Sequence, residues 1–352
     1  MFPPYFAGKF VTIIPDNDDA GRSYAEFIAE AISPYAAGIM MLALPGLAEH
    51  QDVSDYLLSH SATDLLSAIK RAPSWKKKRD GRFLIPAVEF INQAHEEIDW
   101  LVDRAIERNA NGFICADPKV GKSWAAVDLS LCLATGLPWL GFAVPKPAKV
   151  ALIRREDNPG LTAWRMKHLL QGKTLPEGLS DCIASNLYVN TRQQTPELML
   201  DNAEEMAEML TALKEFRPEF VIFDVFNALH AADENDAQEM RRIVAVLSKV
   251  QQEIGTGIGV VHHYNKGDAS ASMTQRLRGS SAIAGWAEWL IGISIVDKET
   301  KTRRMDFELK AAPSPDPVHY VIESDAQASR LTQVPSPNLD VVSRKSDRLR
   351  LV

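Results

Sequence analysis

The sequence lacks the features that define several classes of protein. Its three cysteines, Cys115, Cys132 and Cys182, lie far apart without a C-x-x-C pair, which excludes a disulfide-stapled domain and a zinc site made of cysteines alone. No run reaches the ~18 apolar residues of a membrane helix, and no basic stretch followed by an apolar core opens the chain. We therefore expect no membrane partner, no secretory signal and a cytoplasmic location. Hydrophobic residues make up 46% of the chain, which excludes a disordered protein.

Basic residues are outnumbered by acidic ones, and they are unevenly distributed. The net charge is −7. Residues 1–70 carry nine acidic and three basic side chains, a balance of −6, whereas residues 71–82 carry six basic and one acidic, a balance of +5. The basic stretch has no apolar periodicity, so it predicts a linker over residues 71–85, with a DNA-binding arm as the alternative.

The first unit has acidic residues directly after a strand. The β-branched run at residues 9–14 predicts the strand, and Asp16, Asp18 and Asp19 follow it before a helical stretch at residues 22–32. Carboxylates at such a place suit Mg²⁺, although aspartate equally favours the start of a helix.

This first unit resembles part of a known domain. The string DNDDAG, with DVSDYL downstream, is similar to the second half of a TOPRIM domain, the metal-binding fold of bacterial-type primases and topoisomerases. The resemblance assigns the metal-binding pair to Asp16 and Asp18, but the family's glutamate on an earlier strand has no counterpart before Asp16. It implies a truncated TOPRIM-like segment over residues 1–70, with a vestigial metal pair and no complete primase site.

The second unit contains a phosphate-binding loop. An apolar run at residues 112–115 precedes ADPKVGKS, and a helical stretch at residues 124–134 follows. The pattern G-x-x-x-x-G-K-[ST] is matched except at its first position, where Ala116 stands. Backbone N–H groups at a helix start bind phosphate, lysine reaches the β- and γ-phosphates, and serine binds Mg²⁺. A chance loop is the alternative. The predicted ATP-binding residues are Ala116, Pro118, Lys119, Val120, Gly121, Lys122, Ser123 and Trp124.

Further strands end in polar residues downstream of this loop. Residues 149–153 form a strand-like run that leads to Glu156, and residues 220–223 form another that ends in Asp224. We expect Asp224 to bind Mg²⁺ together with Ser123, although an aspartate at a strand end can serve only as a turn residue. The strand predicted at residues 257–263 ends in two histidines. This βα alternation predicts a mostly parallel sheet, which binds ligands at the carboxyl ends of its strands.

The order of these motifs resembles that of RecA-like, AAA-type ATPases, and more specifically the RepA-like hexameric replicative helicases of phages and plasmids. The matching strings are ADPKVGKSW, LIRRED, FVIFD, ADENDAQEM, VVHHYNKG and RLRGSSAIAGWAEWL, within residues 95–312. The resemblance implies that Glu156 orients the attacking water and that Asp224 is the Walker B acid. It also implies that His263, rather than the adjacent His262, senses the γ-phosphate.

The same resemblance implies contacts between subunits and with DNA. It assigns Arg278 as an arginine finger that reaches a neighbour's nucleotide, with Lys310 as a weaker candidate and a surface arginine as the alternative. A finger in trans requires a homo-oligomer, here expected to be a hexamer. The small, polar segment at residues 264–277 predicts a loop that binds single-stranded DNA through Lys266 and Arg276, or a plain surface loop.

These observations predict an α/β protein with a RecA-like P-loop core over residues 86–328, a C-terminal β-hairpin and a tail over residues 329–352. The predicted function is Mg²⁺-dependent ATP hydrolysis that drives translocation on DNA, or its unwinding, in phage- or plasmid-type replication. One alternative is an ATP-dependent assembly or regulatory protein that binds DNA without unwinding it. Another is a recombination mediator that forms filaments.

Overall fold

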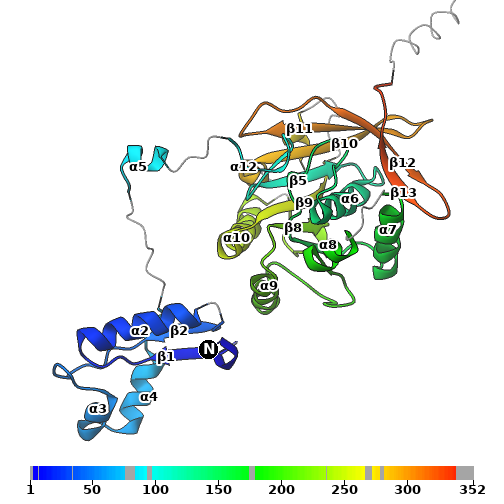
Figure 1. Cartoon of the computed structure of the whole chain (residues 1–352). Coiled ribbons are helices and arrows are strands. Elements are labelled where there is room, and N and C mark those ends of the chain that lie inside the picture. The colour runs from blue at the N-terminus through cyan, green and yellow to red at the C-terminus, as the bar shows by residue number, and fades with distance from the viewer. Residues whose placement is uncertain are drawn as a thin grey trace, which may run out of the picture. The chain divides into compact units, whose positions relative to one another are not determined.

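The protein is described by a computed structural model that covers residues 3–6, 8–33, 35–75, 84–92, 97–173, 179–234, 236–265, 272–277 and 281–337. The chain forms two compact units, residues 1–94 and residues 95–352 (Figure 1). No helix in these ranges is long and apolar enough to cross a membrane.

The first unit is a small α/β structure around two parallel strands. Strands β1 (Phe10–Ile13) and β2 (Gly38–Met41) pair in parallel, and α2 (Asp19–Ile32) connects them. The buried faces of α2 and β2 meet at Ala29, Ile32 and Ile39. The unit also contains α1 (Pro3–Phe6), α3 (Val53–Ser59), α4 (Ala62–Lys70) and α5 (Ala87–Ile91).

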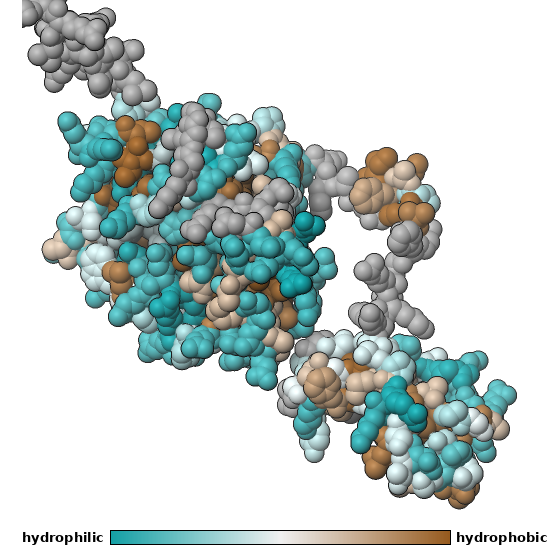
Figure 2. Space-filling view, turned by 180° about the vertical axis from the view of Figure 1, so that it is seen from behind, coloured by the Kyte–Doolittle hydropathy of each residue, from teal (hydrophilic) through white to brown (hydrophobic). Residues whose placement is uncertain are grey.

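Large apolar side chains remain exposed in this unit. Apolar areas (brown) are visible on its surface and on α5 in the space-filling view (Figure 2). Large apolar side chains of the unit that are more than 60% exposed include Phe10, Tyr24, Phe27, Leu58 and Phe90. The core of the unit is correspondingly small.

The second unit is built on a nine-stranded sheet. Its strand order is β13-β12-β11-β10-β5-β9-β8-β6-β7, in which the six strands from β10 to β7 are parallel and the first three strands run antiparallel to their neighbours. The parallel strands are β5 (Asn111–Ala116), β6 (Val150–Arg154), β7 (Leu187–Asn190), β8 (Phe220–Asp224), β9 (Gly257–His263) and β10 (Trp289–Asp297). The antiparallel strands are β11 (Thr302–Leu309), β12 (Val318–Ser324) and β13 (Ser329–Gln333), and β3 (Trp100–Val102) pairs with β4 (Ile106–Glu107) in a separate hairpin.

Helices cover both faces of this sheet (Figure 1). Successive side chains of a strand point to opposite faces, so the sheet has two cores. Ile114 of β5 packs in the core that contains α6 (Lys122–Thr135), whereas Phe113 packs in the core that contains α9 (Ala203–Phe216) and α10 (Ala237–Ile254). The remaining helical elements are α7 (Pro159–Gln171), α8 (Leu179–Asn186), η1 (Phe226–Ala228), α11 (Met273–Arg276) and α12 (Ser281–Trp286).

One glycine in the central strand allows a close approach. A Cβ atom on Gly112 would lie 2.1 Å from the Trp289 ring of β10, far inside van der Waals contact. The buried indole therefore packs directly on the β5 backbone, in the strand that leads to the phosphate-binding loop.

The C-terminal boundary of the sheet differs from the prediction. We expected a hairpin followed by a tail from residue 329, but Ser329–Gln333 forms β13 and pairs antiparallel with β12. The strand is short and polar on its exposed side, so its alternation is too weak to stand out in the sequence.

Candidate functional site

The strongest motif of the sequence forms a tight turn between β5 and α6. Ala116 ends β5 in an extended conformation, so the missing first glycine requires no special backbone. Gly121, directly before α6, has a φ of +114°, a value that side chains rarely tolerate. The first N–H groups of α6 lack partners within the helix, and the helix dipole adds positive potential there. The turn can therefore bind an anion such as phosphate.

Lys122 lies at the centre of this turn. Its Nζ donates to the carbonyl oxygens of Ala116 and Asp117, each at 3.1 Å, and lies 3.1 Å from Nδ1 of His263 at the end of β9. Burial lowers the pKa of the ammonium group, although the nearby Glu156 and Asp224 oppose that effect. A bound triphosphate would give this buried ammonium group an anionic partner in direct contact.

Ser123 and Asp224 place two hard oxygen ligands side by side. The Ser123 hydroxyl donates to Oδ1 of Asp224 at 3.3 Å, and Oδ2 of Asp224 lies 3.3 Å from Nη2 of Arg154. Burial raises the pKa of the fully buried Asp224 carboxyl, against the opposing effect of Arg154. A hydroxyl and a carboxylate at the phosphate turn fit Mg²⁺, which prefers oxygen ligands and keeps several waters.

Glu156 follows β6 on a segment that two buried arginines anchor. Arg154 contacts the carboxylates of Asp157 and Asp224. Arg155 points away and donates to the carbonyl of Thr195 at 2.9 Å, while burial lowers the pKa of its guanidinium to about 10. Glu156 itself is exposed and lines the pocket that faces the phosphate turn.

These groups surround one pocket of about 420 Å³. The residues that line it are Pro118, Lys119, Gly121, Lys122, Ser123, Trp124, Glu156, Asp157, Arg165 and His263. Buried Asp224 lies beneath Ser123 at the same edge of the sheet. The structure thus brings together three of the four predicted catalytic residues and six of the eight predicted ATP-binding residues. Of the other two, Ala116 ends β5 directly before the turn and Val120 lies in it.

Comparison with known proteins agrees with this geometry. The family described as "AAA domain" matches residues 79–269, which is more than half of the chain. The chain belongs to the AAA domain family. A solved structure of an ATPase domain matches with a TM-score of 0.52 at 13% identity, covering 71% of this chain and 96% of the other chain. No curated protein matches the sequence.

The predicted fold class of the AAA domain is therefore confirmed: a mostly parallel α/β sheet with helices on both faces and antiparallel C-terminal strands. The finer resemblance to RepA-like helicases stays a prediction. So do the roles of the individual residues.

The two histidines of β9 have different surroundings in the AAA domain. His263 reaches Lys122, as described above. His262 is fully buried, with Nδ1 3.9 Å from Oε1 of Glu234, and its ring packs near those of Phe113 and Phe226. Of the two, His263 lines the pocket, which favours it over His262 as the sensor.

The predicted DNA-binding residues are only partly within the described ranges. Lys266 and the proposed finger Arg278 lie outside them. Arg276 stacks on the Tyr264 ring at 4.0 Å, and its Nη2 lies 3.4 Å from Oδ2 of Asp117, next to the phosphate turn. Lys310 donates to the carbonyl of Gly285 at 3.0 Å.

Two aspartates of the first unit, Asp18 and Asp52, cap helices. Asp18 is the N-cap of α2, accepting from the Gly21 N–H at 2.6 Å, and it lies 3.1 Å from His50 Nδ1. Asp52, in the downstream string, caps α3 through a capping box with Asp55. No group of three or more Asp, Glu, His or Cys in the described ranges could hold a metal. The helix-cap alternative is confirmed for Asp18, and the TOPRIM assignment stays unconfirmed.

Arg303 is a residue of the site that sequence reasoning missed. From β11, its Nε donates to the carbonyl of Val120 at 2.6 Å, so it holds the phosphate turn from the antiparallel side of the sheet. A Cβ on Gly121 would lie 3.1 Å from the same Nε, so the turn and β11 pack closely. The alternating pattern TRRMDFELK predicted the strand but gave no sign of this contact.

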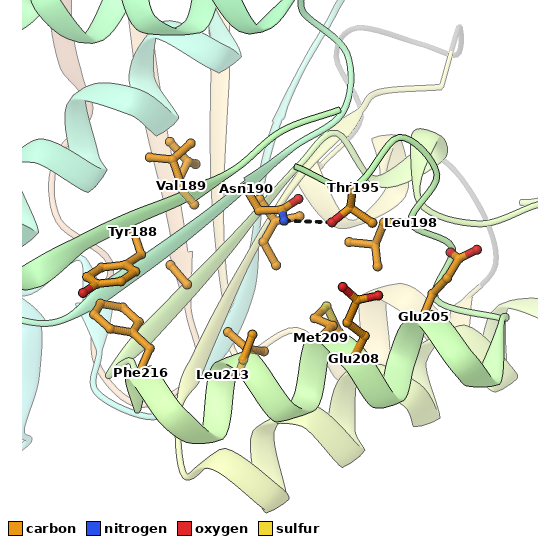
Figure 3. Close-up of a pocket in the computed structure, with 14 residues that line it drawn as sticks. Tyr188, Val189, Asn190, Thr195, Leu198, Glu205, Glu208, Met209, Leu213 and Phe216 are labelled. Carbon is orange, nitrogen blue, oxygen red and sulfur yellow. Dashed lines mark hydrogen bonds between the residues drawn. The ribbon is translucent and has the colours of Figure 1, made fainter. Parts of the chain in front are cut away.

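A second, apolar groove lies between the edge strand β7 and α9. Tyr188, Leu213 and Phe216 line one end of the groove, and Glu208 of α9 also faces it (Figure 3). Its volume is about 200 Å³. Asn190 and Thr195, which bind each other and Arg155, close its polar end. The groove is thus linked to the Glu156 segment, but its described lining has no cluster of reactive groups.

Proposed function

We propose that this chain hydrolyses ATP with Mg²⁺ and uses the energy to move along single-stranded DNA as a ring-forming homo-oligomer. The observation that carries the proposal is the meeting of Lys122, Ser123, Glu156 and His263 in one pocket above Asp224. Together with Asp224, these residues lie at or just after the ends of four strands, β5, β6, β8 and β9. Such a convergence at the carboxyl edge of a parallel sheet supports catalysis on a bound nucleotide.

Each residue has a role that its position supports. The backbone of residues 118–123 binds the phosphates, and Lys122 neutralises their charge. Ser123 and Asp224 would hold Mg²⁺, which neutralises charge that develops on the phosphates. Glu156 is exposed, has no ion pair within the described ranges and borders the pocket, so it can orient the attacking water.

The nucleotide pocket contacts the segment that we propose binds DNA. His263 contacts Lys122 and is followed by the segment 264–277, where Arg276 returns to Asp117 of the phosphate turn. A change in the phosphates would therefore reach this segment from two sides. We assign it to single-strand binding through Lys266 and Arg276, and we assign Arg278 to a neighbour's nucleotide.

Three measurements together test the proposal. They are the rate of ATP hydrolysis, its stimulation by single-stranded DNA, and the mass of the assembly. We expect ATPase activity that single-stranded DNA stimulates, and a multimer when a non-hydrolysable nucleotide and Mg²⁺ are present. Lys122→Ala should abolish nucleotide binding, whereas Glu156→Gln should retain binding and lose turnover. Equal activity of the wild type and Lys122→Ala would disprove the proposal.

An assembly or regulatory function without unwinding is the second candidate. Arg276, assigned to DNA, is largely buried against Tyr264 and Asp117, which limits its reach toward a strand. A strand-displacement assay separates the two functions. DNA-stimulated ATPase activity without displacement would favour the second.

A further inference from the structure

A basic pocket lies between α7 and the hairpin of β12 and β13, which stand side by side (Figure 1). Its volume is about 440 Å³, and it shares no lining residue with the nucleotide pocket. Strand β12 runs in the direction of the parallel strands, so the hairpin turn lies at the edge of the sheet that carries the phosphate turn. The titratable residues that line the pocket are Lys167, His168, Asp325 and Arg330.

The two cations of the basic pocket form no ion pair in the part of the chain that the structure describes. Arg330 donates from Nε to the carbonyl oxygen of Gly172 at 2.7 Å, which holds the guanidinium against the end of α7. The hairpin packs closely on this end of the helix, because a Cβ atom on Gly172 would lie 2.0 Å from the carbonyl oxygen of Ser329. The Nη groups of Arg330 and the Lys167 ammonium group are therefore available to an anion in the pocket.

His168 adds a buried and oriented donor to these cations. The residue is 8% exposed, and its ring stacks on that of Trp164 with 4.0 Å between the ring centroids. Its Nδ1 is buried without a hydrogen-bond partner within the described ranges. Unpaired buried N–H groups are rarer in proteins than unpaired acceptors, so we assign the proton of the neutral ring to Nε2. Because the ring lines the pocket, Nε2 can donate to a ligand there.

Asp325 is the one carboxylate among the described residues that line the basic pocket. Its Oδ1 accepts from the N–H groups of Gln327 and Ala328, each at 2.7 Å, and these bonds lower the pKa of the carboxyl. The group is therefore ionised at neutral pH, and its Oδ2 accepts no hydrogen bond from the described residues. Such a carboxylate repels an anion without a proton, but it accepts a strong hydrogen bond from an anion that has one.

This combination distinguishes between common oxyanions. Hydrogen phosphate keeps an O–H group at neutral pH, whereas sulfate and the phosphodiesters of DNA keep none. An arginine, a lysine and an imidazole N–H suit the oxygens of each of these anions, but Oδ2 of Asp325 suits only an anion that can donate. The lining therefore favours the free phosphate ion over the other two.

We propose that the basic pocket binds inorganic phosphate, with Lys167, His168 and Arg330 donating to its oxygens and Asp325 accepting from its O–H group. Phosphate is the ion that ATP hydrolysis releases, and to that extent the inference rests on the proposed function. The pocket would thus hold a product of the reaction at a place separate from the phosphate turn. A dissociation constant on the order of 1 mM fits so small a ligand.

Equilibrium dialysis of radiolabelled phosphate with the full-length chain tests this. A saturating non-hydrolysable ATP analogue with Mg²⁺ fills the phosphate turn, and Lys122→Ala without nucleotide provides a second way to remove the contribution of the turn. In both cases we expect saturable binding of one phosphate per chain. Sulfate should bind about tenfold more weakly, and single-stranded DNA should not displace the phosphate.

Asp325→Asn tests the selectivity without disturbing the hairpin turn. The amide keeps an oxygen that accepts from Gln327 and Ala328, but it replaces the accepting Oδ2 by an NH₂ group that donates. The tenfold preference for phosphate should disappear, because sulfate gains a donor and loses a repelling charge.

Lys167→Gln and Arg330→Gln test the two cations. Each should weaken phosphate binding about tenfold. Lys167 is exposed, so its variant should fold as the wild type does. Lys249→Gln is the matched control, because it removes an exposed lysine from α10, which packs in the core on the other face of the sheet. It should bind phosphate as the wild type does.

Three results would overturn the inference. They are the absence of saturable phosphate binding when the turn is filled, wild-type affinity in both Lys167→Gln and Arg330→Gln, and sulfate binding by the wild type as tight as phosphate binding. Displacement by single-stranded DNA would likewise reject the free ion as the ligand. A chain that fails to bind the ATP analogue would instead contradict the proposed function, and phosphate binding by Lys122→Ala would still be measurable.

Discussion

The ammonium group of Lys122 lies 3.1 Å from Nδ1 of His263, although 141 positions separate the two residues in the chain. The first begins the helix after β5, and the second ends the adjacent parallel strand β9. The contact joins the phosphate-binding turn to the segment that follows β9.

His263→Ala should uncouple ATP hydrolysis from DNA. Without the imidazole, the state of the phosphates no longer reaches residues 264–277 through Lys122. We expect stimulation of the ATPase by single-stranded DNA to weaken markedly, because only the contact of Arg276 with Asp117 remains, and turnover to fall about tenfold or more. Steady-state assays with and without DNA measure this. His263→Gln keeps a hydrogen-bonding group and should retain part of the stimulation, and full stimulation in His263→Ala would contradict the assignment.

Lys122→Met should remove nucleotide binding and change how stability depends on pH. Burial makes the pKa of Lys122 lower in the folded protein than its ordinary value of 10.5. Between these two pKa values the unfolded chain binds more protons, so the wild type gains stability as pH rises through this window. The variant has no such group, and its stability should not show this gain. Urea unfolding of both proteins from pH 7 into the alkaline range tests this, and parallel curves would rule the explanation out.

A buried ion pair on α6 provides a test of stability. Lys173 Nζ lies 2.6 Å from Oδ1 of Asp128, whose side chain is 4% exposed. Lys173→Met leaves a buried carboxylate without its cation, so we expect a loss of about 3–5 kcal/mol in the free energy of unfolding. The double variant Asp128→Asn, Lys173→Met should recover most of this loss. Should the double variant be as unstable as the single one, the pair would contribute through packing rather than charge.

Arg303→Ala should remove a hydrogen bond that holds the phosphate turn against β11. The carbonyl of Val120 would lose its donor, which costs about 1–3 kcal/mol for a buried acceptor. Because that carbonyl precedes Gly121, we expect a higher KM for ATP as well as lower stability. Arg303→Lys preserves the charge and should be intermediate. An unchanged KM combined with lower stability would restrict Arg303 to a structural role.

The P-loop and the strands that lead to Glu156, Asp224 and His263 could be predicted because their signals are local. An apolar run of a few residues, followed by polar residues at its end, indicates both a buried strand and what lies at its edge. The features that were missed depend on distant or weak signals. Strand β7 has four residues and follows a helix directly, so no turn marks its start.

The contacts of arginine were the least predictable part of the site. Arg154, Arg165 and Arg303 all bind around the pocket, but a charged residue in a sequence does not reveal which distant carbonyl or carboxylate it meets. The choice between helix cap and metal ligand for Asp18 likewise depends on the position of the Gly21 N–H.

The hydrogen bond from Arg303 to Val120 spans 183 positions, so on the ribosome the phosphate turn is made long before its partner strand β11. The strand that carries the P-loop, β5, lies between β9 and β10, both of which are translated long after it. A nascent chain therefore exposes an apolar strand with two open edges until β9 and β10 have emerged. Only then can the turn close and ATP bind, and a ligand that binds only the folded state stabilises it. Under the proposed function, ATP would thus stabilise only chains in which β9 and β10 have already joined the sheet.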